Sequence, residues 1–286
     1  MTANDLAAWR DDVARMRARR DAGLRKPIGW LTLVGLHWLH DGVQPFGAAP
    51  ANEIVLHAEA GDIPDLAGTF EVTGGRVVVH PARGAAVTSD GAPLAGGTEL
   101  FDDEAEAPTM LELGSLRLVL IRRGSGHRLG IRVWDTAAPT LRAFDGLPSF
   151  DADPRWRLTG RMVPAPPGAT IPVPDVLGDV NDEPTPGDVE LTIDGSTHRL
   201  HALDSDGGRV WLVFGDTTNG RETYGGGRFL VTGVVQPDGA VEVDFNAAYN
   251  PPCVFSPFAT CPLPPDGNRL PLRIAAGEKV WHAHDR

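Results

Sequence analysis

Apolar residues recur at every third or fourth position in the first twenty residues of the chain. This stripe consists of Leu6, Trp9, Val13 and Met16. The spacing predicts an amphipathic helix over 2–21, packed on the rest of the protein through the stripe. Thr2 followed by Asp5 resembles a capping box at its start, and Gly23 and Pro27 are stop signals at its end. Charged residues occupy the opposite face, which we expect to be solvated: Arg10, Asp12, Arg17 and Arg19.

From Trp30 onward the pattern changes to short apolar runs separated by Gly, Pro and Asp, which predicts β-strands joined by tight turns. In the first half of the chain the predicted strands are 31–34, 54–57, 69–72, 76–80, 85–88, 110–113, 116–122 and 128–134. In the second half they are 155–163, 189–193, 197–203, 209–214, 228–235 and 240–245. The proline-rich stretch 164–186 is predicted to be a surface connection without regular structure.

Closely spaced strands with hairpin turns favour antiparallel sheets over strands that alternate with helices. We therefore predict a mainly β fold, with sandwich-like or barrel-like antiparallel sheets in two subdomains. The expected division is an N-terminal helix over 1–25, a β-rich subdomain over 26–140, and a second over 150–286 that ends in a proline-rich wrap.

Charge and composition narrow the range of partners. A formal net charge of −12 and a pI of about 5.1 argue against nucleic acid and anionic membranes. No apolar run reaches the roughly 18 residues of a membrane span, and no apolar leader follows Met1. The expectations are a cytoplasmic location and, from the scarcity of lysine beside arginine, a bacterial source. Oligomeric state is left open.

The C-terminal wrap combines several prolines with both cysteines of the chain. Cys253 and Cys261 lack the further ligands of a structural zinc site, and reduced, packed thiols are expected in a cytosolic chain. The histidine pairs His37 with His40 and His282 with His284 are interpreted as ordinary packing or terminal residues. No metal and no cofactor are expected.

Two polar groups are candidates for a binding site. The loop after strand 209–214 presents an acid, hydroxyls and an arginine together, a combination suited to an anionic or polar ligand. Its candidate ligand-binding residues are Asp216, Thr217, Tyr224 and Arg228. The alternative interpretation is a long hairpin loop in which the glycines only permit the turn.

The second group follows from the alternation in strand 240–245, which points Asp244 and Asn246 to the same face. If the wrap covers that face, Asp244 becomes a buried carboxylate and the candidate general base. Asn246, Asn250 and Arg269 complete the set of candidate ligand-binding residues. If the face is open to water, these are solvated side chains.

Long motifs in the second half of the chain carry a family resemblance. They are Phe214-Gly215-Asp216-Thr217-Thr218, Tyr224-Gly225-Gly226-Gly227-Arg228-Phe229, Tyr249-Asn250-Pro251-Pro252-Cys253 and Cys261-Pro262-Leu263-Pro264-Pro265. Together with Gly29-Trp30-Leu31 the chain resembles the bacterial family called domain of unknown function 1684. The resemblance implies no established activity.

Three hypotheses about function follow. In the first, a pocket of the C-terminal subdomain binds a small polar or anionic molecule, with catalysis of an unknown reaction as one form of it. In the second, the same polar residues only satisfy the backbone of the wrap, and the protein is a non-enzymatic structural module. In the third, Trp30, Trp38 and the N-terminal helix form a protein-interaction surface.

Overall fold

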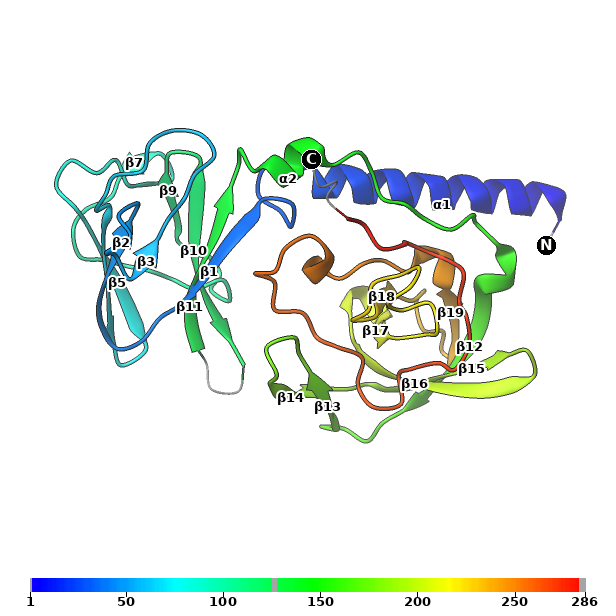
Figure 1. Ribbon diagram of the computed structural model, residues 1–286. Helices are drawn as coiled ribbons and strands as arrows, with labels where there is room; N and C mark the ends of the chain where they lie inside the picture. Colours follow the sequence, from blue (N-terminus) through cyan, green and yellow to red (C-terminus); the bar gives the residue numbers. More distant parts are fainter. Residues whose placement is uncertain (1, 125–127, 283–286) are drawn as a thin grey trace. The chain divides into compact units, whose positions relative to one another are not determined.

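The computed structural model describes residues 2–124 and 128–282, and the chain divides into two compact units. One unit is 24–144, and the other combines 1–23 with 145–286. The predicted turn at Ser125 and Gly126, and His284, lie outside the described residues. The predicted mainly β, antiparallel architecture with an N-terminal helix is confirmed (Figure 1). Within the described residues, no helix is both long and apolar enough to cross a bilayer.

The unit 24–144 contains two sheets that share one core. The six-stranded sheet has the order β1-β11-β10-β9-β6-β7, and the five-stranded sheet has the order β3-β2-β4-β5-β8. The strands are β1 (Leu33–Trp38), β2 (Gly42–Gly47), β3 (Ile54–Val55), β4 (Gly68–Thr73), β5 (Arg76–Pro81), β6 (Thr88–Ser89), β7 (Ala92–Pro93), β8 (Thr98–Glu99), β9 (Met110–Leu113), β10 (Leu116–Arg123) and β11 (Arg128–Asp135), followed by helix α2 (Pro139–Ala143). Buried residues of both sheets, such as Phe70 of β4 and Leu118 of β10, belong to one apolar core, so the unit is a sandwich. Within the five-stranded sheet, Phe46 and Phe70 of adjacent strands stack with ring centroids 4.4 Å apart.

The other unit is built on one curled sheet of order β18-β17-β16-β15-β12-β19. Its strands are β12 (Arg157–Pro164), β15 (Gly187–Ile193), β16 (Ser196–Asp204), β17 (Val210–Phe214), β18 (Arg228–Val231) and β19 (Ala240–Asp244), with 3₁₀ turns η1 (Pro154–Trp156), η2 (Asp206–Gly208), η3 (Phe245–Ala247) and η4 (Pro252–Val254). Gly233 N donates to Glu242 O at 2.8 Å, and Gln236 N donates to Ala240 O at 2.8 Å. The chain after β18 therefore returns to β19, and the sheet curls towards a barrel around an apolar core.

The stretch 164–186 differs from its prediction. It contains an antiparallel ribbon of β13 (Thr170–Pro174) and β14 (Val180–Pro184). In a two-stranded ribbon each strand has one outward edge, so a proline there removes no ladder hydrogen bond. Proline density was therefore the wrong reason to assign this stretch as irregular.

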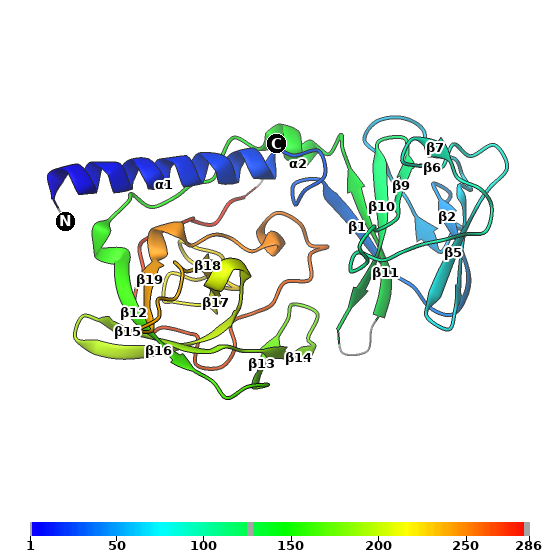
Figure 2. The ribbon, with the colours of Figure 1, turned by 180° about the vertical axis from the view of Figure 1, so that it is seen from behind.

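Helix α1 (Ala3–Leu24) begins at the predicted cap and belongs to the unit of 145–286. Thr2 Oγ1 accepts from Asp5 N at 3.2 Å, and Thr2 N donates to Asp5 Oδ2 at 2.8 Å, which is a capping box with Asp as the acid. Trp9 and Val13 of the apolar stripe are buried. Figures 1 and 2 show the C-terminal segment, coloured red, passing close to α1 in both views.

The C-terminal wrap contains a disulfide between Cys253 and Cys261, so the prediction of reduced thiols is wrong. Two short turns after Pro252 reverse the chain and bring the two Cα atoms to 6.3 Å, inside the range that a disulfide requires. The prediction rested on the rarity of disulfides in cytosolic proteins. That frequency contains no information about the chain reversal that brings these two cysteines together. A cytoplasmic location remains a prediction.

Candidate functional site

Arg228, a predicted ligand-binding residue, is completely buried, with 0% of its side chain exposed. Its Nη2 donates to Asp216 Oδ2 at 2.8 Å and to Ile274 O at 3.0 Å, and its Nη1 donates to Ala276 O. Burial lowers the pKa of Arg228, and Asp216 acts in the opposite direction. The guanidinium thus binds one carboxylate and two backbone carbonyls of the C-terminal segment, which is a structural arrangement.

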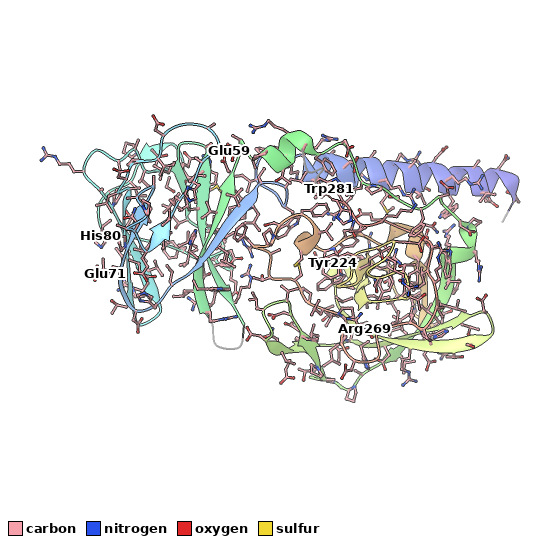
Figure 3. All side chains as sticks on the ribbon, viewed as in Figure 1. Glu59, Glu71, His80, Tyr224, Arg269 and Trp281 are labelled. Carbon is pink, nitrogen blue, oxygen red and sulfur yellow. A yellow bond between two sulfur atoms is a disulfide. The ribbon has the colours of Figure 1, made fainter. Side chains whose placement is uncertain are left out.

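The remaining residues of the 216–228 loop also contact the protein itself. Asp216 Oδ1 accepts from Thr218 N at 2.9 Å, and its Oδ2 accepts from Ile274 N at 3.1 Å. Thr217 is exposed, and Tyr224 is half-buried. Arg269 is exposed, with its backbone paired to Gly215. In Figure 3, Tyr224 and Arg269 lie well away from helix α1, and neither lines the cavities described below.

Asp244 and Asn246 do lie together, as their shared strand face predicts. Asp244 Oδ1 accepts from Asn246 N at 2.9 Å and from Asn246 Nδ2 at 2.8 Å, while its Oδ2 accepts from Trp9 Nε1 at 2.8 Å. Asn246 also exchanges two hydrogen bonds with the backbone of Asp153. Three donors therefore occupy the Asp244 carboxylate, which caps η3 and binds the helix instead of facing a cavity.

A cavity of about 280 Å³ lies beneath α1, and we call it the helix cavity. Its walls come from α1, from the segment around η3 and from the C-terminal segment. The lining residues are Met16, Arg17, Arg20, Asn246, Ala247, Ala248, Tyr249 and Glu278. Most of these surfaces are apolar, and the ionisable groups are two arginines, a tyrosine and one glutamate. Asn246 is the only predicted site residue among them.

Arg20 is fixed on several sides. Its Nε donates to Glu278 Oε1 at 3.1 Å and its Nη2 donates to Asn250 O at 3.0 Å. Its guanidinium carbon lies 5.1 Å from the ring centroid of Tyr249 and 5.8 Å from that of Phe255. Two rings, a carboxylate and a carbonyl therefore hold this cation in one place.

Glu278 is the buried carboxylate of the cavity, with 6% of the residue exposed. Its second oxygen accepts from Asn250 N at 2.7 Å. Burial raises the pKa of Glu278 above its ordinary value, and Arg20 acts in the opposite direction. Burial likewise raises the pKa of Tyr249.

Arg17 differs from Arg20 because most of its hydrogen-bonding capacity is unused by the described residues. Its Nη2 donates to Phe150 O at 2.9 Å, and this is the single side-chain hydrogen bond of Arg17 within the described part of the chain. Burial lowers the pKa of Arg17, with Glu278 opposing this shift. A second cavity of about 120 Å³ also borders Arg17 and Glu278, so this guanidinium is adjacent to two empty volumes.

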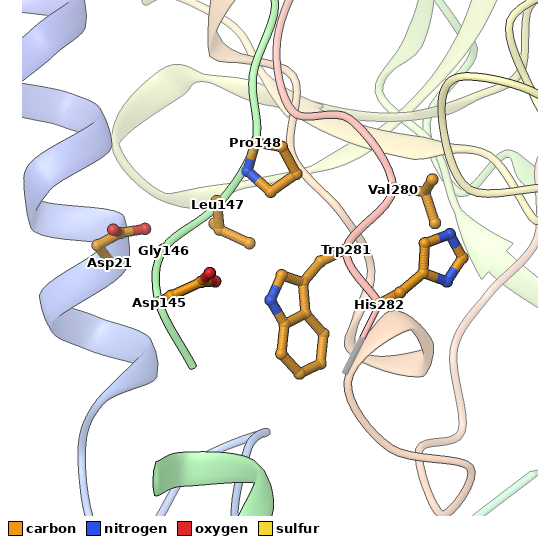
Figure 4. A pocket seen from close by; sticks show the side chains of 8 residues that line it. All are labelled: Asp21, Asp145, Gly146, Leu147, Pro148, Val280, Trp281 and His282. Carbon is orange, nitrogen blue, oxygen red and sulfur yellow. The ribbon is translucent and has the colours of Figure 1, made fainter. Parts of the chain in front are cut away.

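A larger, more open cavity of about 610 Å³ lies near the end of the described chain (Figure 4). Asp21 and Asp145 supply carboxylates and Trp281 a ring, and His282 lies on the opposite side of Trp281 from Asp21. No cluster of three metal-ligating side chains was found in the ranges 2–124 and 128–282. The helix cavity is therefore the stronger candidate, because it joins enclosure with perturbed ionisable groups.

Sequence reasoning placed Arg17 on a solvated helix face and did not single out Arg20 or Glu278. One signal was present. Arg20 follows Met16 by four residues and Val13 by seven, so it continues the apolar stripe of α1. An arginine on a buried stripe needs a partner, which is what Glu278 provides.

Comparisons with known proteins bear on the same unit. Residues 142–279 match the family model described as "Protein of unknown function (DUF1684)". An uncharacterized protein from Haloarcula marismortui, solved by solution NMR, is 30% identical over 49% of this chain and 80% of its own length, with a TM-score of 0.41. No match was found among curated proteins. The chain is therefore a member of the DUF1684 family of proteins of unknown function through its residues 142–279.

Proposed function

We propose that the protein binds a small organic anion in the helix cavity. The carrying observation is Arg17, a half-buried guanidinium that makes one hydrogen bond to described residues and borders two cavities. A half-buried cation whose donors are mostly unused by the described residues favours an anionic group that can accept from them.

The remaining walls define the size and charge of the ligand. Two guanidinium groups and one carboxylate leave one net positive charge in a protein whose formal net charge is −12. Met16, Ala247, Ala248 and the Tyr249 ring supply apolar surface. A volume of about 280 Å³ lies at the small end of ligand sites. These features fit a monoanion with a compact apolar body, such as an aromatic or short aliphatic carboxylate or sulfonate.

Isothermal titration calorimetry tests this proposal with benzenesulfonate, benzoate and hexanoate as probes and benzylamine as the cationic control. We expect the anions to bind and the amine not to bind. Arg17→Gln should weaken anion binding about tenfold to hundredfold, because a charge-assisted hydrogen bond contributes about 1.5–3 kcal/mol.

Arg19→Gln is the matched control, since Arg19 lies on the exposed face of the same helix. It should leave the affinity unchanged. The proposal is wrong if none of the three anions binds the wild-type protein, or if the Arg17 and Arg19 variants bind equally well.

A purely structural role for the unit is the alternative. It is favoured by the 216–228 loop, in which Arg228 and Asp216 bind each other and the backbone of the C-terminal segment. On this alternative the helix cavity has no occupant, and the same titrations give no heat of binding with any probe.

A further inference from the structure

The disulfide closes a short loop that contains one of the two rings around Arg20. Cys253 and Cys261 are eight positions apart, and Phe255 lies between them. Phe255 is buried and also packs against Trp281, with ring centroids 5.7 Å apart. The residues of this segment that contact Arg20 therefore lie near Cys253, at one end of the disulfide loop: Tyr249, Asn250 and Phe255.

Arg20 contacts three successive parts of this segment. The Tyr249 ring lies below the guanidinium carbon, Asn250 O accepts from Nη2, and the Phe255 ring completes the enclosure. Tyr249 is anchored independently, because its backbone exchanges two hydrogen bonds with Phe229 of β18. Phe255 has no such strand to hold it.

The other end of the loop is tied to the β13–β14 ribbon. Val176 N donates to Cys261 O at 3.0 Å, and Leu263 N donates to Pro174 O at 2.7 Å. The S–S bond links this anchored end to Cys253, two residues before Phe255. It therefore links the chain just before the Phe255 ring covalently to the end of the loop that is hydrogen-bonded to the ribbon.

We propose that the Cys253–Cys261 disulfide is a redox switch that controls anion binding in the helix cavity. In the oxidised protein the closed loop keeps Phe255 on Arg20, so the cation is already positioned for a ligand. In the reduced protein the loop relaxes, Phe255 leaves Arg20, and the cavity loses a fixed wall. This inference rests on the proposed function, because the switch acts on the same site.

The chemistry is thiol–disulfide exchange with a dithiol reductant. A reductant thiolate attacks Cys253 Sγ, which is half-buried, whereas Cys261 is 3% exposed. The protein S–S bond breaks, and Cys261 leaves as a thiolate. The second reductant thiol then resolves the mixed disulfide, so the reductant becomes a cyclic disulfide and two electrons and two protons end on the two protein thiols. Intracellular disulfides are commonly of this transient, redox-sensing kind.

Arginine labelling tests the switch without any ligand. Phenylglyoxal modifies accessible guanidinium groups, and peptide mass spectrometry locates them after the reductant has been removed. We expect slow labelling of Arg20 in the oxidised protein, and labelling at least fivefold faster after reduction and in the Cys253→Ser/Cys261→Ser variant. Exposed Arg19 and buried Arg228 are internal controls whose labelling should stay fast and negligible, respectively.

Phe255→Leu keeps the disulfide and removes only the aromatic ring. It therefore tests the inference even if the double cysteine variant fails to fold. It should speed the labelling of Arg20 in the oxidised state. Equal labelling of Arg20 in the oxidised, reduced and Phe255→Leu proteins would overturn the inference.

Benzenesulfonate titrations of the oxidised and reduced proteins complete the test. We expect about tenfold weaker binding after reduction, and unchanged or tighter binding contradicts the switch. If benzenesulfonate binds neither form, the proposed function fails, while the labelling of Arg20 still decides whether the disulfide controls its enclosure.

Discussion

Two arginine–carboxylate pairs lie in the same unit, and they differ in what surrounds them. The side chains of Arg228 and Asp216 are both completely buried, and the hydrogen bonds of the guanidinium go to that carboxylate and to backbone carbonyls. Arg20 and Glu278 border a cavity, beside Arg17, most of whose donors are unused by the described residues. An arginine without adjacent empty volume stabilises the fold, whereas one with both space and unused donors can hold a ligand.

The largest expected effect comes from breaking the fully buried pair. Arg228→Met should lower the free energy of unfolding by about 3–5 kcal/mol, because it leaves Asp216 buried without a counter-charge. Guanidinium-induced unfolding measures the loss. In the fraction that remains folded, binding of benzenesulfonate should be unchanged, since Arg228 does not line the helix cavity.

A stable Arg228→Met variant that has lost anion binding would reverse the comparison. It would identify the 216–228 loop as the ligand site, as the sequence-based hypothesis has it. The double variant Arg228→Met/Asp216→Leu is the control, because removing both charges should recover part of the lost stability.

A smaller effect is expected from the charge of Glu278. Its pKa is raised by burial, so as pH falls through that raised pKa the carboxylate is neutralised before an exposed glutamate would be. Anion affinity should then rise, because the cavity gains net positive charge. Benzenesulfonate is the suitable probe, since it stays ionised throughout the titration.

Glu278→Gln should raise the affinity at neutral pH by about tenfold, which corresponds to about 1.4 kcal/mol, and it should remove the pH dependence. Affinity that falls on acidification in the wild-type protein would show that Glu278 does not act on the bound anion. The same shift sets how protein stability depends on pH. Because the pKa of Glu278 is higher in the folded state, the folded state binds more protons than the unfolded state. The contribution of Glu278 to the free energy of unfolding therefore decreases as pH rises from the ordinary pKa of a glutamate to the raised pKa.

The smallest effect concerns the candidate general base. Trp9→Phe removes one of the three donors to Asp244 and should lower the free energy of unfolding by about 1 kcal/mol. Asp244→Asn should cost a similar amount and leave binding of benzenesulfonate intact, as expected for a cap. Loss of binding with unchanged thermal stability would instead restore Asp244 as a site residue.

Much of the fold was predictable because local signals agreed with the final packing. Thr2 and Asp5 form the expected cap, and strand 110–113 matches β9 from Met110 to Leu113. Strand β2 was missed because its sequence contains Pro45 and two glycines. Such residues are tolerated at particular sheet positions that only the tertiary pairing defines.

The candidate site was less predictable, for a geometric reason. Arg20 and Glu278 are 258 positions apart, and a single sequence contains no local signal that pairs them. Motif density drew attention to Arg228 and its neighbours, where dense polar residues instead satisfy an irregular backbone. The predicted residues Asp216, Asp244 and Asn250 are likewise occupied by protein partners.

The separation of Arg20 from Glu278 also has a consequence for synthesis on the ribosome. Helix α1 is made before its partners Asp244 and Glu278, which follow only after the whole intervening unit 24–144 has been made. Contacts of such long sequence separation form late. A nascent chain that ends between residues 144 and 244 has the whole sequence of the sandwich but neither partner of the helix, so the helix cavity is among the last features of the molecule to form.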